Sequence, residues 1–202
     1  IRPDYQLSPR IIEMQKSGAR VLLIGHHPTL NILQETLGQT TPIGLIVIKD
    51  PIRKDAHEAL KFFSDNDVAV KVISGDNPAT VSAIASQAGV ANAEKYIDAS
   101  TIVTDQQLED AILNYNVIGR ASPFQKHQMI LCLQKHNQKV AMTGDGVNDV
   151  LALKDSDCSI AMASGSDAAR RTAQLVLTDS NFKSMPNVVK EGRRVINNIE
   201  KS

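Results

Sequence analysis

Short apolar runs alternate with amphipathic helical stretches from Gly44 to the end of this 202-residue chain. The runs are nearly continuous in hydrophobicity, which is typical of parallel strands that are buried on both faces. Together with the intervening helices they predict a doubly wound, Rossmann-like α/β domain, in which ligands lie beyond the carboxyl ends of the strands. The predicted strands are Leu45–Ile48, Val68–Ile73, Tyr96–Ile97, Val117–Ile118, Val140–Met142, Ser159–Ala161 and Leu175–Leu177.

Local signals predict where the helices begin and end. Asn77 before Pro78 predicts a helix start, and Gly89 predicts the end of the same helix. Further helices are expected from Pro123 onward, after Ser122, and over Gly146–Lys154 and Asp167–Gln174.

The chain divides into three predicted parts. Residues 1–43 form the remnant of a second α+β domain, with a helix over Arg10–Ser17, a strand over Arg20–Ile24 and a helix over Pro28–Leu37. Residues 44–186 form the main domain. Residues 187–202 form a separate, mostly polar amphipathic helix.

The composition narrows the possible functions. The 22 basic and 22 acidic residues balance, which argues against a nucleic-acid or anionic-membrane surface as the main partner. No stretch approaches 18 apolar residues, so a soluble polypeptide is expected. The two cysteines and five histidines show no metal-ligand spacing, and a reducing, cytoplasmic setting fits this cysteine usage.

The segment Thr143–Asp149 follows the apolar run Val140–Met142 and carries the clearest chemistry. Asp145 and Asp149 are four residues apart, and glycines flank the first of them, so backbone and ligand can approach closely. Carboxylate oxygens at this spacing suit Mg²⁺ held against a phosphate. The alternative is an ordinary acidic turn between a strand and a helix.

Two further elements lie at a predicted strand end and a predicted helix start. Ser74-Gly75-Asp76 offers a hydroxyl and free backbone N–H groups for phosphate oxygens. Lys126, early in its helix, can place a point charge near a transferring phosphoryl group. Each alone has an ordinary alternative, a tight turn or a solvated lysine.

Along the chain the hydroxyl turn comes first, then the lysine, then the acidic loop, and in this order the three elements resemble the phosphate-handling segments of haloacid-dehalogenase-like phosphotransferases. More narrowly, the chain from about Leu45 to its end resembles the phosphorylation domain of P-type cation-transporting ATPases, and residues 1–43 resemble the end of their nucleotide-binding domain. The matching segments are Asp50–Arg53, Val72–Pro78, Gly119-Arg120 before Pro123 and Lys126, Thr143–Asp149, Gly165–Ala169 and Glu191–Ile199.

The resemblance implies Mg²⁺ and ATP as cofactors and assigns a role to each matched residue. Asp145 would ligate Mg²⁺, and Asp149 would support the metal site and its loop. Asn148, Ser74 and Gly75 would bind the phosphoryl group, with Ser74 standing where the family usually has threonine.

The remaining matched residues would support the phosphate or the nucleotide. Lys126 would neutralise charge on the transferred group, and Asp76 would brace the phosphate loop. Asp50 and Arg120 would lie near the ribose, and Arg53 would act at the junction between domains. The terminal helix would be the stalk that leads to a membrane span of the parent pump.

The nucleophile of the family, the aspartate of Asp-Lys-Thr-Gly-Thr, is absent from this sequence. Asp50 and Asp98 follow strand-like runs, but neither has the neighbours or the position that the family requires. The expected protein is therefore a fragment of a pump at the cytoplasmic face of a membrane, whose upstream domains and membrane helices are its natural partners. Alone, it should form no phosphoenzyme and should bind ATP weakly.

The strand that bears the nucleophile would lie between Val68–Ile73 and Val140–Met142. Its absence would leave two rows of unpaired backbone groups. We expect Arg20–Ile24 of the same chain or of a neighbouring chain to fill this gap, the latter giving a strand-exchanged homo-oligomer, or the two strands to close directly on each other.

Two other functions fit parts of the sequence. A soluble phosphatase of the same superfamily would share the acidic loop but would carry a nucleophile near residue 10, and Arg2–Lys16 has none. A non-catalytic interaction module would keep the loop only as a scaffold. The transported ion cannot be read from these residues, although the segment resembles bacterial pumps of the calcium or divalent-cation sort.

Overall fold

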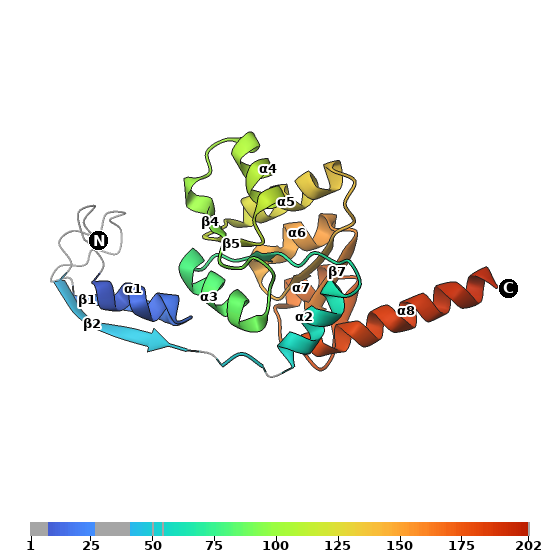
Figure 1. The fold of residues 1–202 in the computed structure, drawn as a ribbon, viewed down its shortest axis with the longest axis horizontal. Coiled ribbons are helices and arrows are strands. Elements are labelled where there is room, and N and C mark those ends of the chain that lie inside the picture. The colour runs from blue at the N-terminus through green and yellow to red at the C-terminus, as the bar shows by residue number, and fades with distance from the viewer. Residues whose placement is uncertain (1–7, 27–40, 50, 54, 202) are drawn as a thin grey trace.

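The computed structural model describes residues 8–26, 41–49, 51–53 and 55–201. Two three-stranded parallel sheets lie at the centre of residues 55–201, with helices packed around them (Figure 1). This arrangement confirms the predicted α/β class. The first sheet has the order β3 (Val72–Ile73), β5 (Val117–Gly119), β4 (Tyr96–Asp98), and the second β6 (Ala141–Gly144), β7 (Cys158–Met162), β8 (Leu175–Leu177).

Helices connect the strands in the order expected for a doubly wound domain. In chain order they are α2 (Ala56–Ser64), α3 (Pro78–Ala88), the 3-10 helix η1 (Ala99–Thr101), α4 (Asp105–Asn114), α5 (Pro123–Lys135), the 3-10 helix η2 (Val147–Asp149), α6 (Val150–Asp155), α7 (Asp167–Thr172), the 3-10 helix η3 (Phe182–Ser184) and α8 (Met185–Glu200).

The central strand of the first sheet is buried on both faces. Val117 packs with Val81 and Ala85 of α3, whereas the next residue, Ile118, packs with Ile112 of α4 and with buried residues of α5. Both are fully buried. Because successive side chains of a strand point to opposite faces, this alternation places helices on both sides of the sheet.

The second sheet repeats the pattern. Ile160 of β7 packs with Phe63 of α2 and Met185 of α8, and the following residue, Ala161, packs with Leu153 of α6 and with a buried alanine of α7. The strands predicted for both sheets are therefore confirmed, except that only Val72–Ile73 of the run Val68–Ile73 forms a strand.

Local sequence signals set the ends of α3. The Asn77 side chain accepts hydrogen bonds from the backbone N–H groups of Ala79 (3.0 Å) and Thr80 (3.4 Å). Gly89 ends the helix in the left-handed conformation, with φ 94°. Both predicted boundaries of this helix are confirmed, because caps depend on residues within one turn.

The N-terminal region differs from the prediction in one respect. Strand β1 (Arg20–His26), which follows α1 (Pro9–Lys16), pairs antiparallel with β2 (Thr41–Ile48). The prediction of Leu45–Ile48 as a strand of the parallel sheet was therefore wrong, and β2 runs across the boundary predicted between residues 43 and 44. The side chains of Leu45 and Ile46 are 41% and 46% exposed, so this apolar run does not have the burial that its hydrophobicity indicated. The helix predicted over Pro28–Leu37 lies outside the described residues.

Strands β3 and β6 are not paired with each other, and in the described part of the chain no strand lies between them. Filling of the gap by Arg20–Ile24 of the same chain was a wrong prediction, and so was direct closure. The physical reason is that β1 pairs its backbone groups with β2, the next strand along the chain, instead of with β3 or β6. Filling of the gap by another chain stays a prediction.

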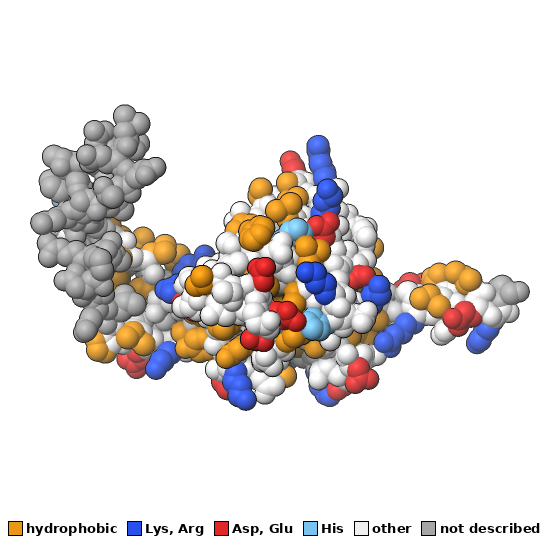
Figure 2. Space-filling model, turned by 90° about the horizontal axis from the view of Figure 1, so that it is seen from above, with side chains coloured by type: hydrophobic (Ala, Val, Ile, Leu, Met, Phe, Trp, Pro, Cys, Tyr) orange, Lys and Arg blue, Asp and Glu red, His pale blue; other side chains and the backbone are white. Residues whose placement is uncertain are grey.

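Helix α8 projects away from the sheets (Figure 1). Its first residue, Met185, is buried, whereas Val195, Ile196 and Ile199 are 47%, 57% and 69% exposed. Figure 2 shows hydrophobic side chains along this projecting helix. Within the described ranges, no helix has the length and hydrophobicity that crossing a membrane would require.

Acid should weaken the fold partly through Asp157, which lies just before β7. Its carboxylate accepts hydrogen bonds from the Val140 backbone N–H (3.0 Å), from Lys139 Nζ (3.0 Å) and from Gln134 Nε2 (3.2 Å). The bond from Val140 first, then those from Lys139 and Gln134, lower the pKa of Asp157 from 3.8 to about 2. A depressed folded-state pKa contributes stability above the unfolded value and loses it as the pH falls through the folded one.

We therefore expect the Asp157 carboxyl carbon to titrate in NMR near pH 2, and the stability that this group contributes to disappear between about pH 4 and pH 2. In Asp157→Asn, the loss of stability over this pH interval should be smaller than in the wild type. A titration midpoint near 4 would contradict this account.

Candidate phosphate and metal site

The loop after β6 presents one exposed carboxylate. Asp145 directly follows Gly144, the last residue of β6, and its side chain makes no hydrogen bond to any residue that the structure describes. Its backbone carbonyl accepts a hydrogen bond from the Ser166 N–H at 2.7 Å, which fixes the loop against the segment before α7. The Asp145 carboxylate is thus held at the carboxyl end of the strand and remains available to a ligand.

The second carboxylate of the loop is buried in an ion pair. Lys126 Nζ donates to Asp149 Oδ1 at 2.7 Å, and the two side chains are 13% and 10% exposed. The other oxygen, Asp149 Oδ2, accepts from the Gly146 N–H at 3.2 Å. The pair joins α5 to η2, and both carboxylate oxygens of Asp149 are engaged within the protein.

Two glycines allow this close packing. A Cβ at Gly144 would lie 2.6 Å from Asp149 Cβ, and a Cβ at Gly165 would lie 2.8 Å from the backbone oxygen of Asp145. Neither distance is possible for real atoms without a shift of the loop. Gly144 and Gly165 are therefore required by the close approach of Asp149 and of the Asp145 backbone, respectively.

The predicted phosphate loop lies at the carboxyl end of β3. The Ser74 N–H donates to the Ile118 carbonyl at 2.9 Å, and Ser74 Oγ accepts from the Asp76 N–H at 3.1 Å. Gly75 is exposed between them. Arg20 of β1 donates to Asp76 Oδ2 at 2.5 Å, so the N-terminal hairpin contacts this loop through an ion pair that sequence reasoning missed.

Arg120 is held by an acidic partner next to the phosphate loop. It adopts a positive φ of 52°, its N–H donates to the Asp76 carbonyl at 2.8 Å, and its guanidinium donates to Asp98 Oδ2 at 2.7 Å. Burial raises the pKa of Asp98, but hydrogen bonds from Ser100 and the charge and hydrogen bond of Arg120 outweigh it, and the net pKa is lowered. Asp98 is thus a structural anion with its partners already in place.

Three predicted site residues remain, namely Asn148, Arg53 and Asp50. Asn148 lies exposed in η2, on the same loop as the two carboxylates. Arg53 donates to the Ser180 carbonyl at 3.2 Å, beyond the end of β8. Asp50 lies outside the described residues.

Comparison with known proteins places this architecture in a family. The model of the family described as haloacid dehalogenase-like hydrolase matches residues 10–157. The chain belongs to the haloacid dehalogenase-like hydrolases. This finding confirms the superfamily that the sequence resemblance predicted.

Relatives of this haloacid dehalogenase-like chain are cation-transporting ATPases. It is 43% identical over 206 residues to the calcium-transporting ATPase CtpE of Mycobacterium tuberculosis (strain CDC 1551 / Oshkosh), covering 98% of this chain and 26% of that protein. It is 44% identical over 199 residues to the probable cation-transporting ATPase exp7 of Streptococcus pneumoniae serotype 4, covering 95% of this chain and 25% of that protein. The chain thus spans about a quarter of the length of these relatives.

A solved structure supports the fold. A zinc-transporting PIB-type ATPase in its E2.Pi state superposes with a TM-score of 0.65 at 24% identity, over 95% of this chain and 26% of that one. At this identity the likeness concerns the fold alone.

The structural role of one basic side chain, Arg170 of α7, was not predicted from the sequence. Arg170 of α7 donates to the carbonyls of Ala163 (2.9 Å) and Gly165 (2.5 Å) and contacts the Asp167 carboxylate. It fixes the turn whose Ser166 N–H binds the Asp145 carbonyl. The segment 165–169 was matched to the family, but no local signal indicated that Arg170 would stabilise the turn before α7.

Proposed function

We propose that this chain is the phosphorylation segment of an ATP-driven cation pump that works through an aspartyl phosphate with Mg²⁺. The observation that carries the proposal is the buried Lys126–Asp149 pair beside the exposed carboxylate of Asp145. A lysine kept in a mostly buried position next to an acidic loop suits a site that must handle a highly charged phosphoryl group. The relatives described as cation-transporting ATPases support the same conclusion.

The donor set fits Mg²⁺, which prefers one or two carboxylates together with water and phosphate oxygens. Asp145 would be the direct ligand, because its carboxylate makes no hydrogen bond to a described residue. Asp149 would hold the loop and Lys126 in place, since Lys126 and the Gly146 N–H engage both of its oxygens. Bound Mg²⁺ would supply positive charge that offsets the charge of the phosphoryl oxygens.

The remaining residues of the proposal bind the phosphoryl group or the nucleotide. Ser74, Gly75 and Asn148 would donate hydrogen bonds to phosphoryl oxygens, and Lys126 would balance their charge. Asp76, which accepts from Arg20, would keep the Ser74 loop in position. Asp50 and Arg120 would lie near the ribose of ATP, and Arg53 would act at the junction between domains.

The aspartate that accepts the phosphoryl group would come from outside these 202 residues. The sequence contains no Asp-Lys-Thr-Gly-Thr, and Asp98 is occupied by Ser100 and Arg120. The chain alone would therefore form no phosphoenzyme and bind ATP weakly. In the parent protein, residues 1–43 would end the nucleotide-binding domain, residues 44–186 would form the phosphorylation domain at the cytoplasmic face, and the projecting α8 would be the stalk.

Titration of the chain with Mg²⁺ tests the metal site. We expect saturable shifts of the backbone amide resonances of residues 144–149, with an affinity lowered roughly tenfold or more in Asp145→Asn, because one of the few charged ligands is lost. Asp105→Asn, which removes an exposed carboxylate from the first turn of α4, is the matched control and should bind as the wild type does. Equal affinity in wild type and Asp145→Asn would refute the assignment.

Hydrolysis assays separate the pump from the phosphatase. The chain should not hydrolyse p-nitrophenyl phosphate, whereas the parent protein should form an acid-stable, hydroxylamine-sensitive phosphoenzyme from ATP. Magnesium-dependent turnover by the chain itself, lost in Asp145→Asn, would instead establish a self-contained phosphatase.

A further inference from the structure

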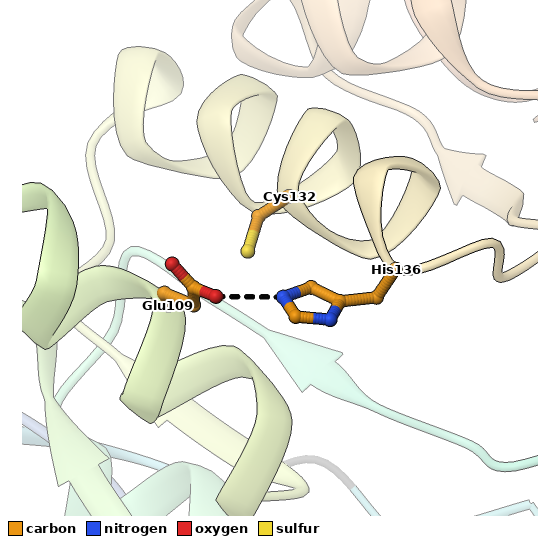
Figure 3. Close-up of side chains that lie close together, drawn as sticks. All are labelled: Glu109, Cys132 and His136. Carbon is orange, nitrogen blue, oxygen red and sulfur yellow. Dashed lines mark hydrogen bonds and ion pairs between the residues drawn. The ribbon is translucent and has the colours of Figure 1, made fainter.

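A second group of ligand-type side chains lies at the other end of α5 from Lys126. Cys132 and His136 come from the last turn of α5 and its C-cap position, and Glu109 comes from α4, which packs beside it (Figure 3). One ligand atom from each residue lies within 4.8 Å of the other two. Figure 3 shows all three side chains directed into the space between the two helices.

The helix geometry explains how the cluster forms. Residues four apart lie on the same face of a helix, so the thiol and the imidazole project side by side toward α4. Glu109 meets them there, with Oε1 2.7 Å from His136 Nε2. The pairing of one cysteine with one histidine on a helix gives no recognisable metal spacing without the third ligand from α4, which explains why the sequence indicated none.

We propose that Glu109, Cys132 and His136 form a binding site for a borderline-soft divalent cation, with Zn²⁺ as the best match. Sulfur, nitrogen and carboxylate oxygen are the three donor types that Zn²⁺ takes in proteins, and three protein ligands leave a fourth tetrahedral position for water. The thiolate and the carboxylate together balance the two charges of the cation. A neutral complex is compatible with the buried position of Cys132.

The thiol distinguishes this cluster from an ordinary surface ion pair. A His136–Glu109 contact alone would need no third partner, yet the structure places Cys132 within reach of both. Burial first, and then the charge of Glu109, raise the pKa of Cys132, so the thiol carries its proton in the metal-free protein. Binding of the cation releases this proton to solvent as the sulfur–metal bond forms.

This site is separate from the proposed phosphate chemistry and does not depend on it. Cys132 lies six residues after Lys126, about 9 Å along the helix axis. A cation there would tie the end of α5 to α4 and would stabilise the folded chain by preferential binding.

Titration of the 202-residue chain with Co²⁺, in excess Mg²⁺ to saturate oxygen-only sites, tests the proposal. We expect one equivalent of Co²⁺ to produce a thiolate-to-cobalt charge-transfer band in the near ultraviolet and intense visible bands of tetrahedral cobalt. Zn²⁺ should displace the Co²⁺ and abolish both. Zn²⁺ should also raise Tm by roughly 5–11 °C when its free concentration is about a hundred times its Kd.

Variants decide which residues bind the cation. The charge-transfer band should disappear in Cys132→Ser. In His136→Gln and in Glu109→Gln the apparent affinity for Co²⁺, read from the same band, should fall at least tenfold. The side chains of His136 and Glu109 are partly exposed, so both can be replaced without unfolding the chain. Cys158→Ser removes the other cysteine and is the matched control, which should keep the band. The proposal is overturned if the wild type gives no thiolate band, if the band survives in Cys132→Ser, or if it is unchanged in His136→Gln.

Discussion

Replacing Lys126 by methionine is expected to lower the free energy of unfolding by about 3 kcal/mol, because it leaves the buried carboxylate of Asp149 without its counter-charge. Methionine keeps most of the side-chain volume, so the loss reports charge and not packing. For a domain of this size the change corresponds to a fall in Tm of roughly 6–12 °C. Urea unfolding at pH 7 measures it directly.

A matched lysine tests whether burial is the cause. Lys139 also forms an ion pair, with Asp157 at 3.0 Å, but its side chain is 90% exposed. Lys139→Met should therefore cost no more than about 1 kcal/mol. The double variant Lys126→Met/Asp149→Asn, in which no buried charge remains, should recover part of the loss. Equal effects of the two single lysine variants would contradict this account of the pair.

Substitution of Gly119 by alanine is expected to have a similarly large effect, about 3 kcal/mol. Gly119 ends β5 where the first residue of α3, Pro78, lies directly against it. An added Cβ would lie 2.4 Å from Pro78 Cα and 2.6 Å from Pro78 N and Cβ. Because these are atoms of a rigid ring and its backbone, the strand and the helix start would have to separate, and Ser74 and Asp76 flank the same junction.

Gly75→Ala provides the control for this prediction. Gly75 lies in the neighbouring loop, and among the residues that the structure describes its added Cβ would meet only the Ala121 carbonyl oxygen at 3.8 Å, an ordinary contact. Its effect on stability should be within about 1 kcal/mol in either direction. Thermal unfolding of both variants gives the comparison, and similar Tm values for the two would show that the Gly119 contact is not tight in solution.

The parts of the fold that depend on near neighbours could be predicted from the sequence. Asn77 and Gly89 set the ends of α3 through contacts within one turn, so local chemistry was sufficient there. The hydroxyl turn, the lysine and the acidic loop were found in this chain order from short motifs. The role of the Asp145 and Asp149 pair as a metal loop was inferred on the same basis and stays a prediction.

The parts that depend on distant pairing could not be predicted. The run Leu45–Ile48 has the hydrophobicity of a buried strand, but its partner is β1, and periodicity does not specify a partner. The contact of Arg20 with Asp76 joins residues 56 positions apart, and the approach of Glu109 to Cys132 depends on how α4 packs against α5. Such contacts follow from tertiary packing alone.

The lack of pairing between β3 and β6 has a consequence for how the domain unfolds. In the described residues no backbone ladder crosses from one sheet to the other, so helix packing and the Lys126–Asp149 pair transmit stability between them. Each half has its own apolar cluster, with Val140 and Val70 packing across between them, and we expect one half to open while the other stays folded when this packing is weakened. Cooperative unfolding of the two sheets therefore depends on side-chain contacts between them. When those contacts are removed, the calorimetric enthalpy of unfolding should exceed the van't Hoff enthalpy.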